Sequence, residues 1–472
     1  MDSDTFREQA HKLVDWMADY LDEVENYPVK SQVEPREIFS SLPDKAPHEG
    51  ESFDVLFKDF QDIILPGITH WQSPSFFAYF PANSSRISVL AEMLTATIGA
   101  QCMSWVTSPA ATELEERVME WLREMIGLPP VFQAGVIQDT ASTATLCSLL
   151  TAREQVTNYS TNESGLYKQK QLIVYCSTET HSSIEKDVKI IGLGKENLRK
   201  IPVDDKYAMI PERLEEVIQQ DLERGYQPMA VVVAIGTTGS TAIDPLKEIC
   251  RIARIHNLWV HVDAALAGTA LVLPHLRWMV EGVDQADSFV FNPHKWMFTN
   301  FDCSAYFVKD PEALVRTFEI LPEYLKTKSQ GVKNYRDWGV QLGRRFRALK
   351  LWWVIRSYGV RGIQEKVQLH LDLASWVRKQ VEEDPEFELL APTPLNTVSF
   401  RFCPPTVQDE DQLNQLNEEL MERVNKTGKI YITHTKLANK FTLRFVVGQT
   451  EVQERHVVAG WELIRNTTSQ MI

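Results

Sequence analysis

The segment DSFVFNPHKW, residues 287–296, places a basic pair directly after an apolar run. The run ends at Asn292, and His294 and Lys295 follow beside a tryptophan. A lysine is unfavourable in a half-buried turn because taking its ammonium group out of water is costly. The same desolvation favours the neutral amine, which is the form that attacks an aldehyde. Lys295 is therefore a candidate Schiff-base lysine.

Pyridoxal phosphate is the aldehyde cofactor that such a lysine would hold, and it needs three further groups. A carboxylate must pair with the protonated ring nitrogen to keep the ring an electron sink, and Asp263 in HVDAA could do so. A flat side chain must support the ring, and His181 in STETHSS can stack there. The phosphate needs backbone N–H groups at the start of a helix, which residues 139–155 predict. That helix opens with Thr140, Ala141 and Ser142.

Each of these features also has a purely structural interpretation. An aspartate at the end of a strand commonly caps a helix or forms a turn, and a single histidine is commonly just a hydrogen-bonded polar residue. A threonine-rich start is typical of helix N-caps, and Lys295 could extend its amine to solvent. The functional interpretation is favoured because all four features follow expected strands of one α/β region, and ligands bind beyond the carboxyl ends of such strands.

Residues 135–310 alternate short β-rich runs with helical segments. The expected strands are residues 171–177, 229–238, 258–265, 287–292 and 303–309. The helices expected between them include residues 210–225 and 245–257. The strands are apolar nearly throughout, which indicates a mostly parallel sheet with helices on both faces. The predicted fold class is therefore α/β.

The regions on either side have different patterns. Residues 4–25 carry apolar side chains at helical spacing, and a proline-containing connector follows them. Beyond residue 370, a helix and two strands (396–402 and 441–447) are typical of a small α+β domain. We expect an N-terminal helical segment at 1–85 that packs on its own chain or a second subunit, a large α/β domain at 86–369 and a small C-terminal domain at 370–472.

The composition disfavours several classes of partner. The chain has 472 residues and a formal charge of −15, which argues against nucleic-acid and anionic-membrane binding and favours a small-molecule substrate. Its longest apolar run, MAVVVAI, is too short to cross a bilayer. Six scattered cysteines without a CxxC pair fit reduced thiols in a cytoplasmic protein.

Other catalytic motifs are absent from the sequence. It contains neither the GxGxxG of dinucleotide-binding folds nor the GxxxxGK of P-loops, and it contains neither HExxH nor GxSxG. Its histidines and cysteines form no cluster with zinc spacing, so no metal is expected.

Longer motifs resemble those of one enzyme family. PGITHWQSPSFFAYFPANSS, SPAATELE, HVDAA, NPHKW, NFDCSA and LGRRFRALKLWW are similar, in the same order, to segments of the group II pyridoxal-phosphate decarboxylases, most closely the aromatic-L-amino-acid decarboxylases. The resemblance extends from near residue 1 to about residue 465. It implies the fold type I architecture of aspartate aminotransferase, pyridoxal phosphate as the cofactor, and a homodimer with active sites at the subunit interface.

The resemblance also implies roles for individual residues. Lys295 matches the Schiff-base lysine of the family, Asp263 the partner of the ring nitrogen and His181 the stacking histidine. The other implied cofactor-binding residues are Thr140, Ala141, Ser142, Thr238, Ala265, Asn292 and His294. The implied substrate-pocket residues are Trp71, Tyr79, Phe80, Pro81, Ala82, Gly343 and Met103, the last of which the partner subunit would contribute.

A few positions depart from the family pattern. Ala82 replaces a threonine, Met103 an aromatic residue and Cys102 a smaller residue, which widens or softens the pocket. Gly343 matches a position where glycine leaves room for an indole, which favours tryptophan among the substrates. Asp139 stands where animal members have glycine, and its side chain is expected to turn away from the phosphate.

Tyr324, in LPEYLKTKSQGVKNYRDW, matches the mobile-loop tyrosine that serves as proton donor in the family. The polar loop around it is typical of a lid because it offers few apolar anchors. The implied reaction of this carboxy-lyase is decarboxylation of tryptophan, tyrosine, DOPA or phenylalanine to an arylalkylamine and CO₂, with Tyr324, helped by His181, protonating Cα. Alternatives are an aromatic aldehyde synthase, in which phenylalanine would be expected at 324, an aminotransferase, or a non-catalytic homologue that binds the cofactor.

Overall fold

A computed structural model describes residues 1–320 and 331–471, and its internal contacts divide the chain into two compact units. The sheet unit comprises Ala82–Asp372 and Ala391–Thr397. The terminal unit comprises Met1–Pro81, Leu373–Leu390 and Val398–Ile472. The division at 85 and 369 that the sequence suggested stays a prediction.

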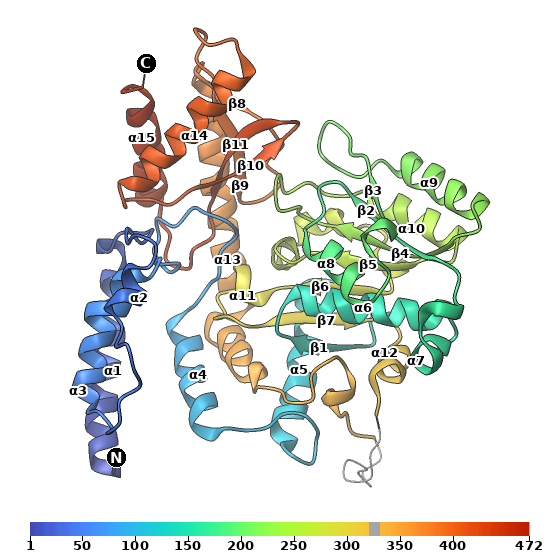
Figure 1. The fold of residues 1–472 in the computed structure, drawn as a ribbon, viewed down its shortest axis with the longest axis horizontal. Coiled ribbons are helices and arrows are strands. Elements are labelled where there is room, and N and C mark those ends of the chain that lie inside the picture. The colour runs from blue at the N-terminus through green and yellow to red at the C-terminus, as the bar shows by residue number, and fades with distance from the viewer. Residues whose placement is uncertain (321–330, 472) are drawn as a thin grey trace. The chain divides into compact units, whose positions relative to one another are not determined.

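The sheet unit is built on seven strands in the order β1-β7-β6-β5-β4-β2-β3 (Figure 1). Only β7 runs antiparallel to its neighbours, so the predicted α/β fold with a mostly parallel sheet is confirmed. The strands are β1 (Ala134–Gln138), β2 (Leu172–Ser177), β3 (Leu198–Ile201), β4 (Gln227–Ala234), β5 (Trp259–Asp263), β6 (Ser288–Phe291) and β7 (Ser304–Val308).

The five strands expected in this region are present; four have shorter bounds than predicted, and β4 begins at Gln227 rather than at residue 229. β4 ends at Ala234 rather than at residue 238 because Gly236, with φ +85°, begins a turn that returns the chain to pair Ile235 with Ile243. β1 and β3 were not predicted. Both are short edge strands, and such segments carry too few residues for a clear apolar pattern.

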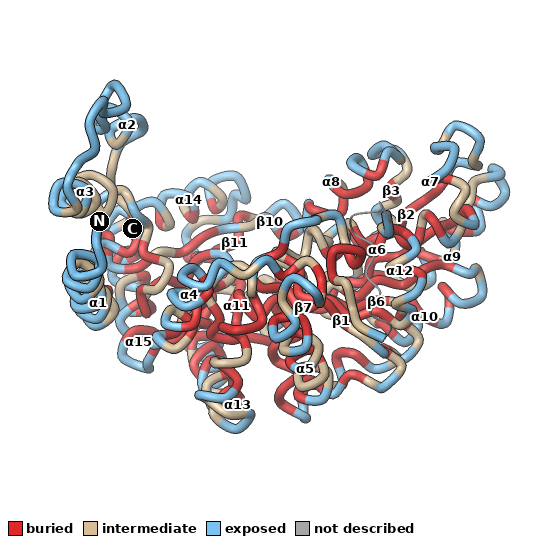
Figure 2. Tube along the Cα trace, turned by 90° about the horizontal axis from the view of Figure 1, so that it is seen from below, coloured by how far each residue is buried: buried red, intermediate tan, exposed pale blue. Residues whose placement is uncertain are grey.

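Helices cover both faces of this sheet. On one face, Leu172, Val174 and Cys176 of β2 pack in one cluster with α6 (Ala141–Val156) and α8 (Ser183–Ile190). On the other face, the hydroxyl of Tyr175 donates a 3.1 Å hydrogen bond to Asp221 of α9 (Pro211–Glu223). Alternate residues of β2 therefore contact helices on opposite faces of the sheet. Figure 2 shows the buried strands between helices whose outer faces are exposed.

The remaining helices of the sheet unit connect the strands or flank them. They are α4 (Arg86–Ile98), α5 (Pro109–Met125), α7 (Ser160–Ser164), α10 (Leu246–Ile255), α11 (Pro293–Trp296), α12 (Pro311–Phe318) and the first part of α13 (Arg347–Glu383), which is broken at Gly359. None of the helices in the described part of the chain is long and apolar enough to span a membrane.

The terminal unit contains a second, antiparallel sheet in the order β10-β11-β9-β8. Its core includes Phe77, whose ring stacks on Phe445 with centroids 4.1 Å apart. Helix α1 buries none of its residues, although Trp16 meets Phe57 and Phe60 edge-on. The elements are α1 (Ser3–Glu23), α2 (Glu37–Ser41), α3 (Phe53–Asp59), β8 (Phe387–Leu389), β9 (Thr397–Phe402, with Thr397 assigned to the sheet unit), α14 (Glu410–Lys426), β10 (Thr433–Leu437), β11 (Lys440–Val446) and α15 (Glu454–Thr468).

A histidine lies at the centre of the sheet unit. His261 of β5 is fully buried, with Thr145 Oγ1 3.0 Å from its Nε2 and Ser288 Oγ 2.8 Å from its Nδ1. Burial lowers the pKa of His261 to about 4 despite the charge of Asp263. The imidazole is therefore neutral in the folded protein at neutral pH.

This histidine predicts a loss of stability in mild acid. Its folded-state pKa lies below the unfolded value of about 6.5, so the unfolded chain binds the proton first as pH falls. The neutral imidazole contributes fully to the free energy of unfolding above pH 6.5, and this contribution is lost as the pH falls towards 4. At pH 5 the loss amounts to about 2 kcal/mol. We expect the free energy of unfolding, measured with urea, to fall less between pH 7 and pH 5 in His261→Gln than in the unaltered protein. The difference should equal that loss, because glutamine cannot titrate. An unchanged pH dependence would contradict this.

Candidate active site

Three parallel strands in register bring their carboxyl ends together. Asp263 at the end of β5 pairs with Ala234 of β4 and with Val290 of β6. The backbone continues this pairing beyond the strands, since the N–H of Ile235 donates to the carbonyl of Asp263 at 2.9 Å. The N–H of Asn292 likewise donates to the carbonyl of Ala265 at 2.9 Å. The turns that follow β4, β5 and β6, with half-buried Thr238 on the first, therefore share one edge of the sheet.

Lys295 lies on the four-residue helix α11, directly after β6. It is half-buried between two buried residues, and its N–H donates to the carbonyl of Asn292 at 2.9 Å. Trp296 is fully buried, and its Nε1 donates a 2.8 Å hydrogen bond to Nδ1 of His370. This tryptophan anchors the turn, so the half-buried lysine expected from the sequence has a fixed backbone.

Asp263, His181 and Lys295 lie in one electrostatic neighbourhood. His181 is exposed at the surface, but desolvation by the groups around its ring lowers its pKa; Asp263 opposes the shift and Lys295 adds to it. The N–H of Ser183 donates to His181 Nδ1 at 3.1 Å, which leaves Nε2 to carry the proton of the neutral ring. Asp263 is itself oriented, because its Oδ1 accepts the N–H of Ala265 at 3.1 Å. The structure thus brings together the carboxylate, imidazole and amine that the sequence predicted.

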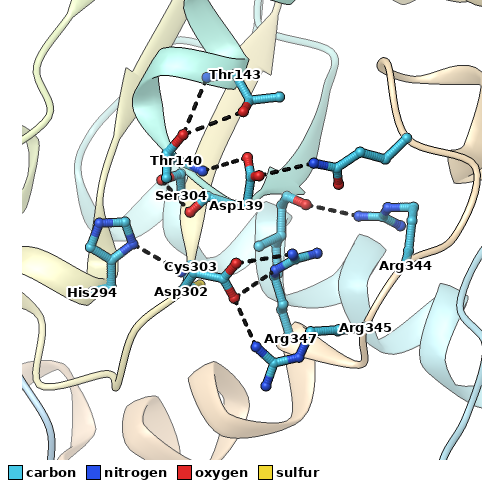
Figure 3. Close-up of polar contacts among 12 residues, drawn as sticks. Asp139, Thr140, Thr143, His294, Asp302, Cys303, Ser304, Arg344, Arg345 and Arg347 are labelled. Atoms are coloured by element: carbon cyan, nitrogen blue, oxygen red, sulfur yellow. Dashed lines mark hydrogen bonds and ion pairs between the residues drawn. The ribbon is translucent and has the colours of Figure 1, made fainter. Parts of the chain in front are cut away.

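His294 is a neutral hydrogen-bond donor with a fixed tautomer. The backbone N–H of Cys303 donates to its Nδ1 at 2.9 Å, so the ring proton is on Nε2 (Figure 3). Burial, the largest cause, and Lys295 lower the pKa of His294 to about 3. The residue beside the lysine therefore adds no positive charge at neutral pH.

The start of helix α6 provides neutral donors. Thr140 is the N-cap, and its hydroxyl accepts the N–H of Thr143 at 3.3 Å (Figure 3). Ala141 and Ser142 lie in the first turn of the helix, so no carbonyl group of the helix precedes them to accept hydrogen bonds from their N–H groups. A helix N-terminus of this kind suits an anion such as phosphate.

Ser304 connects this helix start with the end of β6. Its hydroxyl oxygen lies 2.8 Å from Asn292 Oδ1 and 3.3 Å from the carbonyl oxygen of Asp139. Asn292 is thereby held beside the turn that leads into α6. Nothing in the spacing of the sequence indicated that Ser304 has this connecting role.

Two of the predicted pocket segments of the sheet unit lie side by side. The N–H of Arg336 donates to the carbonyl of Met103 at 2.8 Å, and the N–H of Cys102 donates to that of Arg344 at 3.0 Å. Gly343, immediately before Arg344, would bring an added Cβ within 3.3 Å of Gln101. Ala82 belongs to the same unit, next to Asn83, whose N–H donates to the carbonyl of His294 at 2.9 Å.

The other predicted pocket residues belong to the terminal unit, with Pro81 at its boundary. Tyr79 and Trp71 stack with ring centroids 5.6 Å apart. Tyr79 has φ +50°, an uncommon conformation for a residue with a side chain. Its N–H donates to Thr433 Oγ1 at 3.0 Å, and its carbonyl accepts Arg444 Nη2 at 3.4 Å.

Arg444 is a residue that the sequence interpretation missed. It is buried, its guanidinium lies 5.2 Å from the centroid of the Phe80 ring, and burial lowers its pKa to about 10. Its contacts hold both Tyr79 and Phe80 in position. A charged residue inside the apolar strand FTLRFVV is the signal that could have identified it.

The residues at the sheet edge fit pyridoxal phosphate. The site supplies an amine on a rigid turn, a carboxylate beside an imidazole and neutral N–H groups at a helix start, which match the aldehyde, pyridine and phosphate parts of the cofactor. Tyr324 lies outside the described residues, so the structure gives no position for it.

The chain matches known proteins along its whole length. Residues 35–403 match the model of the pyridoxal-dependent decarboxylase conserved domain. Tryptophan decarboxylase 2 of Oryza sativa subsp. japonica is 43% identical over 100% of this chain and 96% of its own, and phenylacetaldehyde synthase of Arabidopsis thaliana is 44% identical over 100% and 97%.

A solved structure gives the same result. The crystal structure of Oryza sativa TDC with PLP and tryptamine superposes with a TM-score of 0.97 at 37% identity, covering 100% of this chain and 99% of the other. The fold is therefore fold type I, as the sequence resemblance implied, and the cofactor is pyridoxal phosphate. The chain belongs to the pyridoxal-dependent decarboxylase family.

Proposed function

We propose that this carboxy-lyase decarboxylates aromatic L-amino acids, tryptophan among them, to arylalkylamines and CO₂. The observation that carries the proposal is the grouping of Lys295, Asp263 and His181 at one sheet edge beside the start of α6. The full-length similarity to a tryptophan decarboxylase supports the aromatic substrate class. The family's name states the reaction type.

Pyridoxal phosphate, when bound, supplies the electron sink for the pair released from the Cα–carboxylate bond. Lys295 would hold the cofactor through its amine from the rigid α11 turn. Ala141 and Ser142 would bind the phosphate by their N–H groups, together with Thr140, Thr238 and Asn292, and His294 would contact the cofactor from its position beside Lys295.

Asp263 and His181 would control the electronic state of the ring. Asp263 is held by the N–H of Ala265, so its other oxygen remains to pair with the protonated pyridine nitrogen. The neutral ring of His181 offers a flat face, with Ala265 proposed on the opposite side. His181 can also donate the proton on Nε2, which supports its part in protonating Cα together with Tyr324.

The aromatic wall of the terminal unit supports an aromatic substrate side chain. Trp71, Tyr79 and Phe80 present rings, and Tyr431 adds a hydroxyl 3.3 Å from that of Tyr79. The wall is rigid because Thr433 and Arg444 hold the backbone of Tyr79. Ala82, Met103 and Gly343 of the sheet unit are the further substrate-pocket residues that the family resemblance implies.

Replacing Lys295 by alanine should abolish both cofactor anchoring and amine formation. The purified protein should absorb light near the edge of the visible range, and Lys295→Ala should lose this band and release no CO₂ from tryptophan, tyrosine, DOPA or phenylalanine. Lys309→Ala, which changes a partly exposed lysine directly after β7, should keep both. CO₂ release by Lys295→Ala at the normal rate would show that another residue does this chemistry.

An aromatic aldehyde synthase is the second candidate, because a phenylacetaldehyde synthase is 44% identical to this chain. The two reactions differ in product: an amine, or an aldehyde with ammonia and peroxide. Tyr324 favours the decarboxylase, since a phenol can donate a proton to Cα and a phenylalanine cannot.

Tyr324→Phe should therefore change the product. Amine formation should fall by about 100-fold or more because the general acid is lost. Aldehyde and peroxide should appear in its place, as measured by chromatography and a peroxidase assay. Production of aldehyde and peroxide by the unaltered protein would favour the synthase instead.

We also propose that the active form is a homodimer that works in the cytoplasm. The cytoplasmic location is supported by six unpaired cysteines, five of them buried. The dimer is supported by an apolar stripe on α4, where Leu90, Leu94 and Ile98 follow one another at four-residue spacing and are 48%, 42% and 61% exposed.

Charged residues in this stripe should dissociate the dimer. Leu94→Lys combined with Ile98→Lys would bury two unpaired charges, so the dimer Kd should rise by about 30-fold or more. Sedimentation velocity over a concentration series measures this. Leu222→Lys, at an exposed leucine of α9, is the matched control and should leave the Kd unchanged. A dimer that resists the double substitution would exclude α4 from the interface.

A further inference from the structure

Asp139 places a carboxylate at the start of the helix that opens the proposed phosphate site. Its Oδ1 accepts the N–H of Thr140 at 2.7 Å (Figure 3). Its Oδ2 accepts a hydrogen bond from Nε2 of Gln341 at 2.9 Å. Hydrogen bonds from Thr143, Thr140 and Gln341, together with the charge of Arg347, lower its pKa, although burial alone would raise it. Asp139 is therefore ionised at neutral pH.

This carboxylate takes one donor away from the helix start. The N–H of Thr140 is bonded to Asp139, and that of Thr143 is bonded to the Thr140 hydroxyl. Ala141 and Ser142 keep their N–H groups for a ligand. An anion at this position would therefore be held by few donors and would lie beside an existing negative charge.

The basic residues nearby are already matched by acidic ones, so they leave no surplus positive charge for an added anion. Arg347 binds both oxygens of Asp302, at 3.1 Å each, and Arg345 binds Asp302 at 3.1 Å (Figure 3). Lys350 lies 3.1 Å from Glu92. The three positive charges of Arg345, Arg347 and Lys350 are therefore equal in number to the three negative charges of Asp302, Glu92 and Asp139. A phosphate dianion would add two negative charges to a group whose charges already cancel.

We propose that Asp139 is an affinity-determining residue that weakens the binding of the cofactor phosphate, so that the protein exchanges pyridoxal phosphate readily. The inference rests on the proposed cofactor site at α6. Asp139 acts through its charge alone, and the bond from Gln341 holds that charge in place. It is a positioning and affinity residue rather than a catalytic one.

An isosteric substitution separates the charge from the hydrogen bonds. In Asp139→Asn, the amide oxygen can still accept the N–H of Thr140, and the amide nitrogen can donate to Gln341 once that side chain turns over. Only the charge is lost. The affinity for pyridoxal phosphate should rise by about tenfold or more. Asp139→Gly, which also removes the charge, should change the affinity in the same direction.

The experiment measures the Kd of the cofactor-free protein for pyridoxal phosphate and for pyridoxal, by fluorescence titration and equilibrium dialysis. Pyridoxal keeps the aldehyde and ring but lacks the phosphate, so its Kd should not change in Asp139→Asn. Inorganic phosphate should compete with pyridoxal phosphate more strongly in the variant. Glu281→Gln, which removes an exposed charge paired with Lys247, should behave like the unaltered protein.

The outcomes distinguish this inference from the proposed function. If the unaltered protein binds pyridoxal phosphate and both Asp139 variants bind it equally or less tightly, Asp139 does not weaken phosphate binding. A gain of affinity that is equal for pyridoxal would also overturn the inference, because the effect would not act through the phosphate. If the unaltered protein binds neither compound, the proposed cofactor site itself is wrong.

Discussion

The register of β4, β5 and β6 is the constraint on which the site depends. Each backbone amide at the ends of these strands is bonded to a neighbouring strand or turn, from Ile235 to Asp263 and from Asn292 to Ala265. Buried amides need such partners, so the turns cannot shift independently. The carboxylate of Asp263 and the turn that carries Lys295 are therefore fixed relative to each other by the sheet.

Desolvation then sets the charges of the site histidines. Both site histidines have lowered pKa values and each accepts a backbone N–H on Nδ1, so each presents one N–H donor and no positive charge. The helix start contributes donors that are also neutral. Asp139 adds an ionised carboxylate next to these neutral donors, and so it can affect the binding of an anion at the start of α6.

In the terminal unit, side-chain hydrogen bonds fix the backbone conformation of Tyr79. Tyr79 adopts a left-handed backbone conformation that is rarely favourable for a bulky residue, and it persists because Thr433 and Arg444 bind its N–H and carbonyl. These two residues face each other in the pairing of β10 and β11. The ring of Tyr79, stacked on Trp71, is consequently placed by a sheet that lies more than 350 residues later in the chain.

The sequence by itself determined the fold class, five of the seven large-sheet strands and the family, because these depend on local apolar runs and on contiguous motifs such as NPHKW. It did not predict β1 or β3, the early end of β4, the tautomer of His294 or the partners of Asp139 and Arg444. Those depend on groups far away in the chain: Gln341 is 202 residues from Asp139, and Arg444 is 365 residues from Tyr79. Only tertiary structure decides such contacts, because a hydrogen bond requires two groups to meet in space and the spacing of residues along the chain does not specify which pairs will do so.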